Sequence, residues 1–90
     1  MSIIERIFFR MGNLAKLVKA FSDALGINPE VVNDNLSYGD APWDSVAHMA
    51  IVAAIENAFD IMMDTDDVID MSSFAKAKEI IGKYGIDIQS

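Results

Sequence analysis

The chain has 90 residues, a length typical of one domain, and its 14 acidic against 7 basic residues give a formal charge of −7. This balance argues against binding to a nucleic-acid backbone, which needs clustered lysine and arginine, and favours a partner with a basic surface. The sequence has no cysteine, which excludes disulfides, protein thiolates and cysteine–zinc sites. It has no apolar run long enough to cross a bilayer and no cleavable leader pattern, so we expect a cytoplasmic protein.

The first predicted element is an amphipathic helix that ends at Gly26. Apolar residues recur at spacings of three and four over residues 4–25, which indicates one face of a helix. Ser2 followed by Glu5 is a capping-box pattern and predicts a helix start at the N-terminus. Gly26 itself is suited to the left-handed conformation that ends a helix.

Gly12-Asn13 weakens the middle of this helix and makes Asn13 a candidate cap for a separate one. We therefore divide the single domain, residues 1–90, into an N-terminal helical extension over 1–12 and a core over 13–86. The extension carries excess apolar residues, which often mark an interface. A monomer and self-association through the extension are both compatible with this pattern.

A long loop follows, in which Asn28-Pro29 predicts a short helical turn. Three apolar residues are expected to pin this loop to the core: Val32, Leu36 and Tyr38.

The second main helix is predicted to open at Asp44 or Ser45 and to run to Phe59. A connection with one short helical turn over residues 66–69 follows it.

The last helix is predicted to open at Ser72 or Ser73 and to end near Lys83, before Gly85. No strand-like alternation appears. The predicted fold is all-α: a small four-helix bundle of three main helices and one short helix, with a long first loop.

Asp44, Ser45 and His48 are the residue types of a hydrolytic triad, but they lie within one turn of one helix. A nucleophile needs a base within hydrogen-bond reach and an oxyanion site, usually assembled from several elements. We therefore predict that the protein is not an enzyme and that His48 is a solvated helix residue.

Four aspartates in "DTDDVID", residues 64–70, are the candidate metal ligands. A calcium loop needs glycine at its sixth position, and Ile69 stands there instead. We predict no metal site and interpret these acids as a solvated helix start, stabilised by the positive end of the helix dipole.

Ser45 has two interpretations. It or Asp44 can cap the second main helix. A serine at a helix N-terminus is also a favourable place to attach a phosphate, because free N–H groups and the helix dipole favour an anion there.

Asp44-Ser45-Val46 resembles the Asp-Ser-Leu attachment motif of the acyl carrier protein family. Leu25-Gly26-Ile27 resembles the family's "LGI/LGV" at the end of the first helix, and Glu56 with Phe59-Asp60 resembles the end of its second helix. Tyr38 takes the place of a loop aromatic, and "SSFAKAKEIIGKYGI" resembles the final helix. The resemblance covers residues 14–86.

The resemblance implies an acyl-carrier-like bundle with a 4′-phosphopantetheine cofactor covalently attached to Ser45, flanked by Asp44 and Val46. A separate phosphopantetheinyl transferase would attach the arm from coenzyme A, and an acyl group would be carried on it as a thioester. The implied partners also include an acyl-loading ligase or synthase and an acyl-accepting transferase. The residues that would line an acyl cavity are Val52, Ile55, Phe59, Met63, Val68 and Met71.

In the family, several acidic residues on the exposed face of the second helix bind partner enzymes, whereas this sequence has mostly alanine there. Its expected docking residues form an alanine stripe with one acid: Ala47, Ala50, Ala54, Ala58 and Glu56. This departure predicts a specialised carrier with a dedicated partner, in lipid (including fatty acid), polysaccharide or secondary-metabolite biosynthesis.

The sequence also allows two functions other than that of an acyl carrier. One is an aminoacyl or aryl carrier protein. The other is a methionine-rich helical interaction module without a prosthetic group, in which Ser45 is only a cap.

Overall fold

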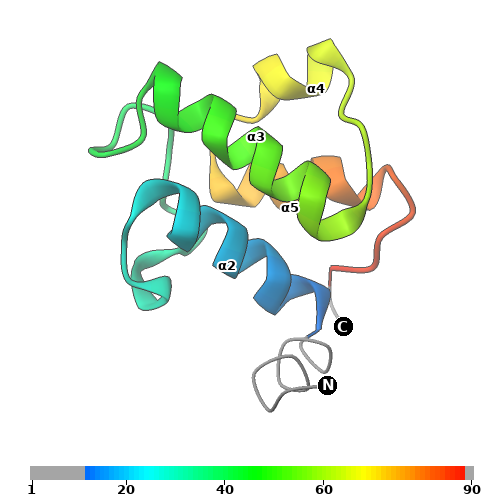
Figure 1. The fold of residues 1–90 in the computed structure, drawn as a ribbon, viewed down its shortest axis with the longest axis horizontal. Helices are drawn as coiled ribbons and strands as arrows, with labels where there is room; N and C mark the ends of the chain where they lie inside the picture. Colours follow the sequence, from blue (N-terminus) through cyan, green and yellow to red (C-terminus); the bar gives the residue numbers. More distant parts are fainter. Residues whose placement is uncertain (1–11, 89–90) are drawn as a thin grey trace.

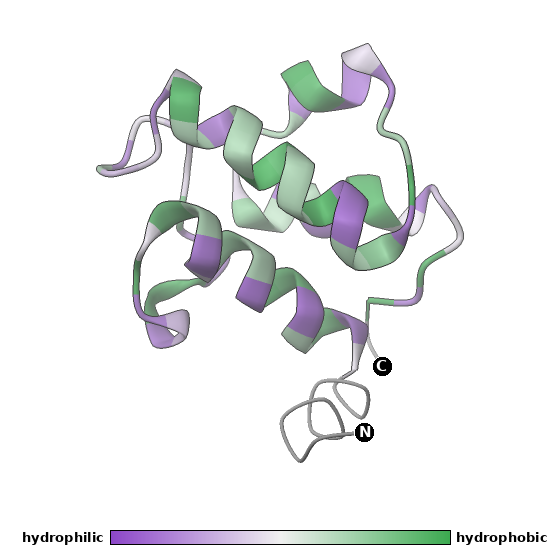
Figure 2. Ribbon diagram, in the orientation of Figure 1, coloured by the Kyte–Doolittle hydropathy of each residue, from purple (hydrophilic) through white to green (hydrophobic). Residues whose placement is uncertain are grey.

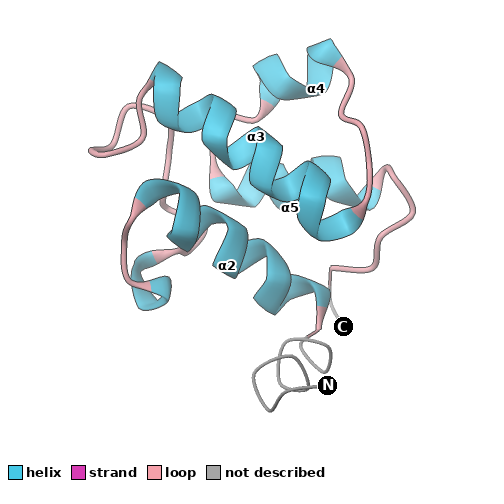
Figure 3. Cartoon of the chain, viewed as in Figure 1, coloured by secondary structure: helices cyan, strands magenta, loops and turns pink. Residues whose placement is uncertain are grey.

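The computed structural model describes residues 12–88, which form four α-helices and one 3₁₀ turn and contain no named strand (Figure 3). In chain order the elements are α2 (Asn13–Leu25), η1 (Pro29–Val31), α3 (Ser45–Phe59), α4 (Thr65–Asp70) and α5 (Phe74–Gly82). The expected all-α bundle of three main helices and one short helix, with a long first loop, is confirmed. Of the predicted extension, all but Gly12 lies outside the described residues.

The two ends of α2 are fixed by different devices. Gly26 is left-handed at the C-cap, with φ 66°, and its N–H donates to the Ser22 carbonyl, as the sequence predicted. At the other end Gly12, with extended backbone, is the N-cap in place of the expected Asn13. The Asn13 amide instead donates to the Asp87 carbonyl at 2.9 Å, which ties the start of α2 to the C-terminal segment.

The other predicted helix starts are confirmed by their caps. The Asn28 side chain accepts from the Glu30 N–H at 2.9 Å and opens η1. Of the two serines proposed for the last helix, Ser73 is the cap, because its hydroxyl accepts from the Lys76 N–H at 3.0 Å.

The core lies where α2 and α3, which run antiparallel side by side, meet α5 (Figure 1). Hydropathy colouring shows the contrast between the largely apolar α3 and the polar bands of α2 (Figure 2). Each large side chain buried here contributes roughly 1.5–3 kcal/mol to folding. The largest fully buried side chains are Trp43, Phe21, Leu17, Ile51, Ile55, Met71 and Ile81.

The long loop is attached to the start of α5 by a short backbone ladder. The Leu36 carbonyl accepts from the Phe74 N–H, and the Tyr38 N–H donates to the Ser72 carbonyl, both at 2.9 Å. Val32 and Leu36 pack on the core as predicted. Tyr38 does not: it is 50% exposed.

The deepest anchor of the loop is Trp43, which is 1% exposed. Its ring meets Phe21 of α2 edge-on, with centroids 5.3 Å apart. Trp43, rather than Tyr38, is therefore the loop aromatic that enters the core, and Tyr38 stays at the surface with its ring edge-on to that of Trp43, with centroids 6.4 Å apart.

The short helix α4 is fastened to the end of α5 through Asp67. Its carboxylate accepts from the Lys83 ammonium at 2.5 Å and the Tyr84 hydroxyl at 2.6 Å. The Tyr84 oxygen in turn accepts from the Asp64 N–H at 2.8 Å. A six-residue helix is not stable alone, so such contacts decide where α4 lies.

The prediction that the aspartates of residues 64–70 form a solvated helix start is wrong for Asp67. It is 6% exposed, and the hydrogen bonds from Lys83 and Tyr84 hold its pKa below the ordinary aspartate value. The same hydrogen bond raises the pKa of Lys83.

No helix among residues 12–88 is both long and apolar enough to span a membrane. The cytoplasmic location stays a prediction.

The Asp67 contacts predict a specific acid sensitivity. Because the folded-state pKa of Asp67 is lowered, its contribution to stability is present above the ordinary aspartate pKa and is lost as pH falls through the folded value. We expect Asp67→Asn to lower the melting temperature at neutral pH and to flatten the decline of stability in acid. Thermal unfolding from neutral to acidic pH measures both. Asp66→Asn, at an exposed neighbouring position, is the control, and equal effects of the two variants would contradict this assignment.

Candidate functional site

Ser45 is the first residue of α3, and its side chain is exposed. The helix is capped by Asp44, whose carboxylate accepts from the Ala47 N–H at 2.8 Å. The Ser45 hydroxyl has no hydrogen-bond partner among residues 12–88. Of the two cap candidates the structure therefore selects Asp44, and the Ser45 oxygen is available for chemistry.

The start of α3 also offers donors for an anion. The N–H groups of Ser45 and Val46 are in the first turn and have no acceptor within the described part of the chain. The dipole of this 15-residue helix favours negative charge at the same place. A phosphate ester on the Ser45 oxygen fits this setting.

Beside Ser45 lies an apolar groove of about 450 Å³, between the long loop, α3 and α4. We call it the serine groove. Met71 forms its buried floor, while Tyr38, Met49 and Ile69 are exposed along it. Its lining consists of Tyr38, Ser45, His48, Met49, Val68, Ile69, Met71 and Ser72.

The residues predicted for an acyl cavity divide into two groups. Val68 and Met71 line the serine groove. Val52, Ile55 and Met63 are core residues with at most 7% exposure, and Phe59 packs against that core. The structure thus brings two of the six to the side of Ser45.

The prediction that His48 is a solvated helix residue is wrong. It is half-buried, its Nδ1 accepts from the Trp43 indole N–H at 3.0 Å, and its Nε2 lies 2.7 Å from the Val68 carbonyl oxygen. Both ring nitrogens are engaged, so His48 is not placed to deprotonate Ser45. No sequence signal marks these contacts, because Val68 is 20 residues away.

The alanine stripe is not one exposed face. Ala50 is exposed, whereas Ala47, Ala54 and Ala58 are half-buried. Ala54 and Ala58 border a hollow of about 150 Å³ against α2, lined also by Lys16, Lys19, Ala20 and Asp23.

Glu56, the acid of the predicted docking set, is half-buried and accepts from the Met63 N–H at 3.0 Å. It thereby holds the segment that follows α3. The docking role of all five residues stays a prediction.

Charge is unevenly distributed along the chain. Residues 26–72, which include the loop, α3 and α4, contain ten aspartates and glutamates and no lysine or arginine. The lysines of the described residues belong to α2 and to the segment from α5 to Lys83. Ser45 therefore lies in the acidic half of the sequence, beside exposed apolar side chains.

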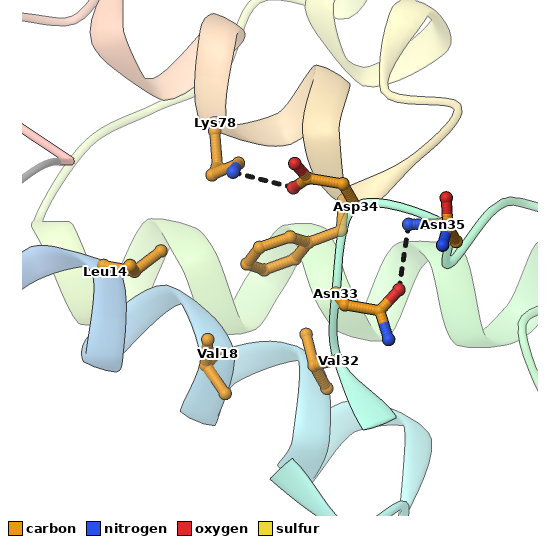
Figure 4. Close-up of a pocket in the computed structure, with 8 residues that line it drawn as sticks. Leu14, Val18, Val32, Asn33, Asp34, Asn35 and Lys78 are labelled. Carbon is orange, nitrogen blue, oxygen red and sulfur yellow. Dashed lines mark hydrogen bonds and ion pairs between the residues drawn. The ribbon is translucent and has the colours of Figure 1, made fainter. Parts of the chain in front are cut away.

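A second groove, of about 420 Å³, lies between α2, the loop and α5 (Figure 4). Leu14 and Val18 face it from α2, and the ion pair of Lys78 with Asp34, at 2.7 Å, crosses its edge. No serine, threonine or tyrosine hydroxyl lines this second groove. Among the described residues no cluster of three or more histidine, aspartate or glutamate side chains could hold a metal ion.

Residues 15–81 match the family model described as "Phosphopantetheine attachment site". The chain is also similar to 3-methylorcinaldehyde synthase of Talaromyces stipitatus, with 32% identity over 63 residues, covering 70% of this chain and 2% of that protein. It is 27% identical over 71 residues to polyketide synthase 2 of Metarhizium guizhouense, covering 79% of this chain and 3% of the relative. No solved structure matches the chain.

The cap assignment predicts that neighbouring residues differ in their effect on stability. Asp44→Ala removes the cap and should cost about 1 kcal/mol of unfolding free energy. Ser45→Ala removes a hydroxyl without a protein partner and should change stability by no more than about 0.5 kcal/mol. Urea unfolding of both variants measures the difference. A larger loss for Ser45→Ala than for Asp44→Ala would mean that Ser45 is the cap.

Proposed function

The chain belongs to the phosphopantetheine attachment-site family, and we propose that it is an acyl carrier with Ser45 as the attachment residue. The family's covalent cofactor is 4′-phosphopantetheine. When bound, this group supplies a flexible arm whose terminal thiol can hold an acyl group as a thioester. The proposal rests above all on the free, exposed hydroxyl of Ser45 at the start of α3 and beside an apolar groove.

Each neighbouring residue has a separate task in this proposal. Asp44 caps α3 and so leaves the Ser45 oxygen unoccupied. The N–H groups of Ser45 and Val46 face the phosphate end of the arm. The serine groove gives apolar contact to the arm or its cargo, through Met49 and Ile69 in particular.

The protein itself performs no catalysis under this proposal. A phosphopantetheinyl transferase joins the Ser45 oxygen to the pantetheine-side phosphorus of the diphosphate in coenzyme A. The bond from this phosphorus to the bridging oxygen breaks, and adenosine 3′,5′-bisphosphate leaves with that oxygen. The proton of the hydroxyl passes to a base of the transferase or to solvent. Loading and unloading of the acyl group belong to a synthase or ligase and to an acyltransferase.

The cargo we propose is a polyketide-type acyl group, in a secondary-metabolite pathway. One relative is named a polyketide synthase and the other a synthase of 3-methylorcinaldehyde, which supports this class over fatty acids. Val52, Ile55 and Met63 are packed in the core, so the apolar space that Ser45 lines is the exposed serine groove. The chain spans only 2–3% of these relatives' length, so it matches one small part of each.

Partners are proposed to meet an apolar surface around Ser45. Val46, Met49 and Ile69 are 79%, 57% and 72% exposed, and acidic residues of the loop and α4 accompany them. A partner with an apolar centre and a basic rim complements this surface.

The attachment proposal is tested by intact mass. Purified protein is incubated with coenzyme A, magnesium and a promiscuous phosphopantetheinyl transferase. The wild type should gain one phosphopantetheine, and Ser45→Ala should gain none. Ser72→Ala is the matched control, because Ser72 is an exposed serine that lines the same groove, and it should be modified like the wild type. A wild type that stays unmodified with several transferases would favour the interaction module instead.

The docking surface makes a separate kinetic prediction. Val46→Asp places a charge at the centre of the apolar contact, where it must be desolvated when the transferase binds. We expect KM for the carrier to rise about tenfold, or about 1.4 kcal/mol, while kcat changes less. Ala53→Asp adds the same charge at an exposed position farther along α3 and should leave KM within about twofold of the wild type. Similar KM values for the two variants would count against an apolar docking centre.

A further inference from the structure

His48 joins three separate parts of the chain. Its Nδ1 accepts from the indole N–H of Trp43 in the loop, and its Nε2 meets the Val68 carbonyl of α4. The Trp43 and His48 rings are nearly parallel, with 16° between their planes, and Tyr38 meets the imidazole edge-on with the ring centroids 5.6 Å apart. The orientation of His48 is therefore set from several sides.

The two hydrogen bonds also fix its tautomer. An indole N–H can only donate, so Nδ1 must carry a lone pair, and a carbonyl oxygen can only accept, so Nε2 must carry the hydrogen. The imidazole is thus neutral and Nε2-protonated. The opposite tautomer would place two donors against each other at Trp43 and two acceptors at Val68.

The Val68 carbonyl depends on this bond. It lies in the last turn of α4, and a longer helix would pair it with the Ser72 N–H. Here the Ser72 N–H donates to the Asp70 carbonyl at 2.8 Å instead. His48 thus caps α4 from a neighbouring helix, as histidine near a helix C-terminus is able to do.

This cap complements the Asp67 contacts with Lys83 and Tyr84. Those contacts hold α4 to the end of α5, and His48 holds it to α3. Val68 and Ile69 of α4 form one wall of the serine groove, while His48 and Met49 of α3 form another. The His48–Val68 bond therefore joins the two walls of the groove beside Ser45.

We propose that His48 is a positioning residue that latches α4 to α3 and so sets the width of the serine groove. The role in holding the arm or its cargo rests on the proposed carrier function, whereas the latch itself does not. Loss of the latch should let α4 move away from α3 without unfolding the contact of α2 with α3.

Amide hydrogen exchange tests the latch on the protein without the arm. His48→Leu fills similar space but cannot form either bond, and the amides of residues 68–71 should exchange about fivefold faster than in the wild type. The amides of α2 should be unaffected. His48→Gln keeps one acceptor and one donor and should restore part of the protection. Met49→Leu alters the same groove without touching the latch and should match the wild type.

The tautomer of His48 reports its two hydrogen bonds directly, and a change in side-chain packing alone would not produce the same tautomer signal. Nitrogen-15 NMR of the wild-type imidazole should show a protonated Nε2 and an unprotonated Nδ1. A protonated Nδ1, or an even mixture of tautomers, would overturn the proposal even if His48→Leu did not fold. Unchanged exchange of residues 68–71 in a folded His48→Leu protein would overturn it as well.

Different measurements test the latch and the carrier function, so one can be contradicted while the other is supported. If the wild type gains no phosphopantetheine but the exchange and tautomer results are as expected, the latch stands and the carrier function falls. If the arm is attached but α4 is insensitive to His48, the carrier function stands and the latch falls.

Discussion

The burial of Trp43 is the constraint on which the arrangement around Ser45 depends. The indole packs against Phe21 of α2, and its N–H is bonded to His48 of α3. The next residue, Asp44, caps α3, and the one after it, Ser45, is exposed. Three consecutive residues are thus the core anchor, the helix cap and the proposed attachment residue. The loop presents this hydroxyl in a fixed place because Trp43, two residues before Ser45, is buried in the core.

The short helix α4 shows how a marginal element is placed by other parts of the fold. Six residues cannot form a stable helix alone. Asp67 bonds to Lys83 and Tyr84, while the Val68 carbonyl bonds to His48. Val68 also packs against the core, and Met71, which follows α4, is fully buried, so side-chain burial and these hydrogen bonds together hold α4 in place.

The sequence was sufficient for the local features. Helical periodicity, Gly26 as a C-cap and Asn28-Pro29 as a turn start all depend on neighbours along the chain, and the structure confirms them. The sequence did not decide which of two adjacent residues caps a helix. The side-chain hydrogen bonds identify Asp44 rather than Ser45 for α3, and Ser73 rather than Ser72 for α5.

The non-local features were not predictable in the same way. His48 was expected in solvent and Tyr38 in the core, yet Trp43 takes the buried place and orients His48. Asp67 was grouped with solvated acids because its partners, Lys83 and Tyr84, are 16 and 17 residues away. Ser45 was identified through a resemblance that joined the Asp44-Ser45-Val46 motif to the helices around it over residues 14–86. The family match supports the cofactor rather than the particular serine.

The most direct measurement is therefore the location of the arm on the chain. Protein modified by a phosphopantetheinyl transferase is digested, and fragmentation mass spectrometry assigns the added group to a residue. We expect the whole of the added group on Ser45. An arm on one of the other nearby serines, Ser37, Ser72 or Ser73, would contradict it, because those side chains do not stand at the start of α3.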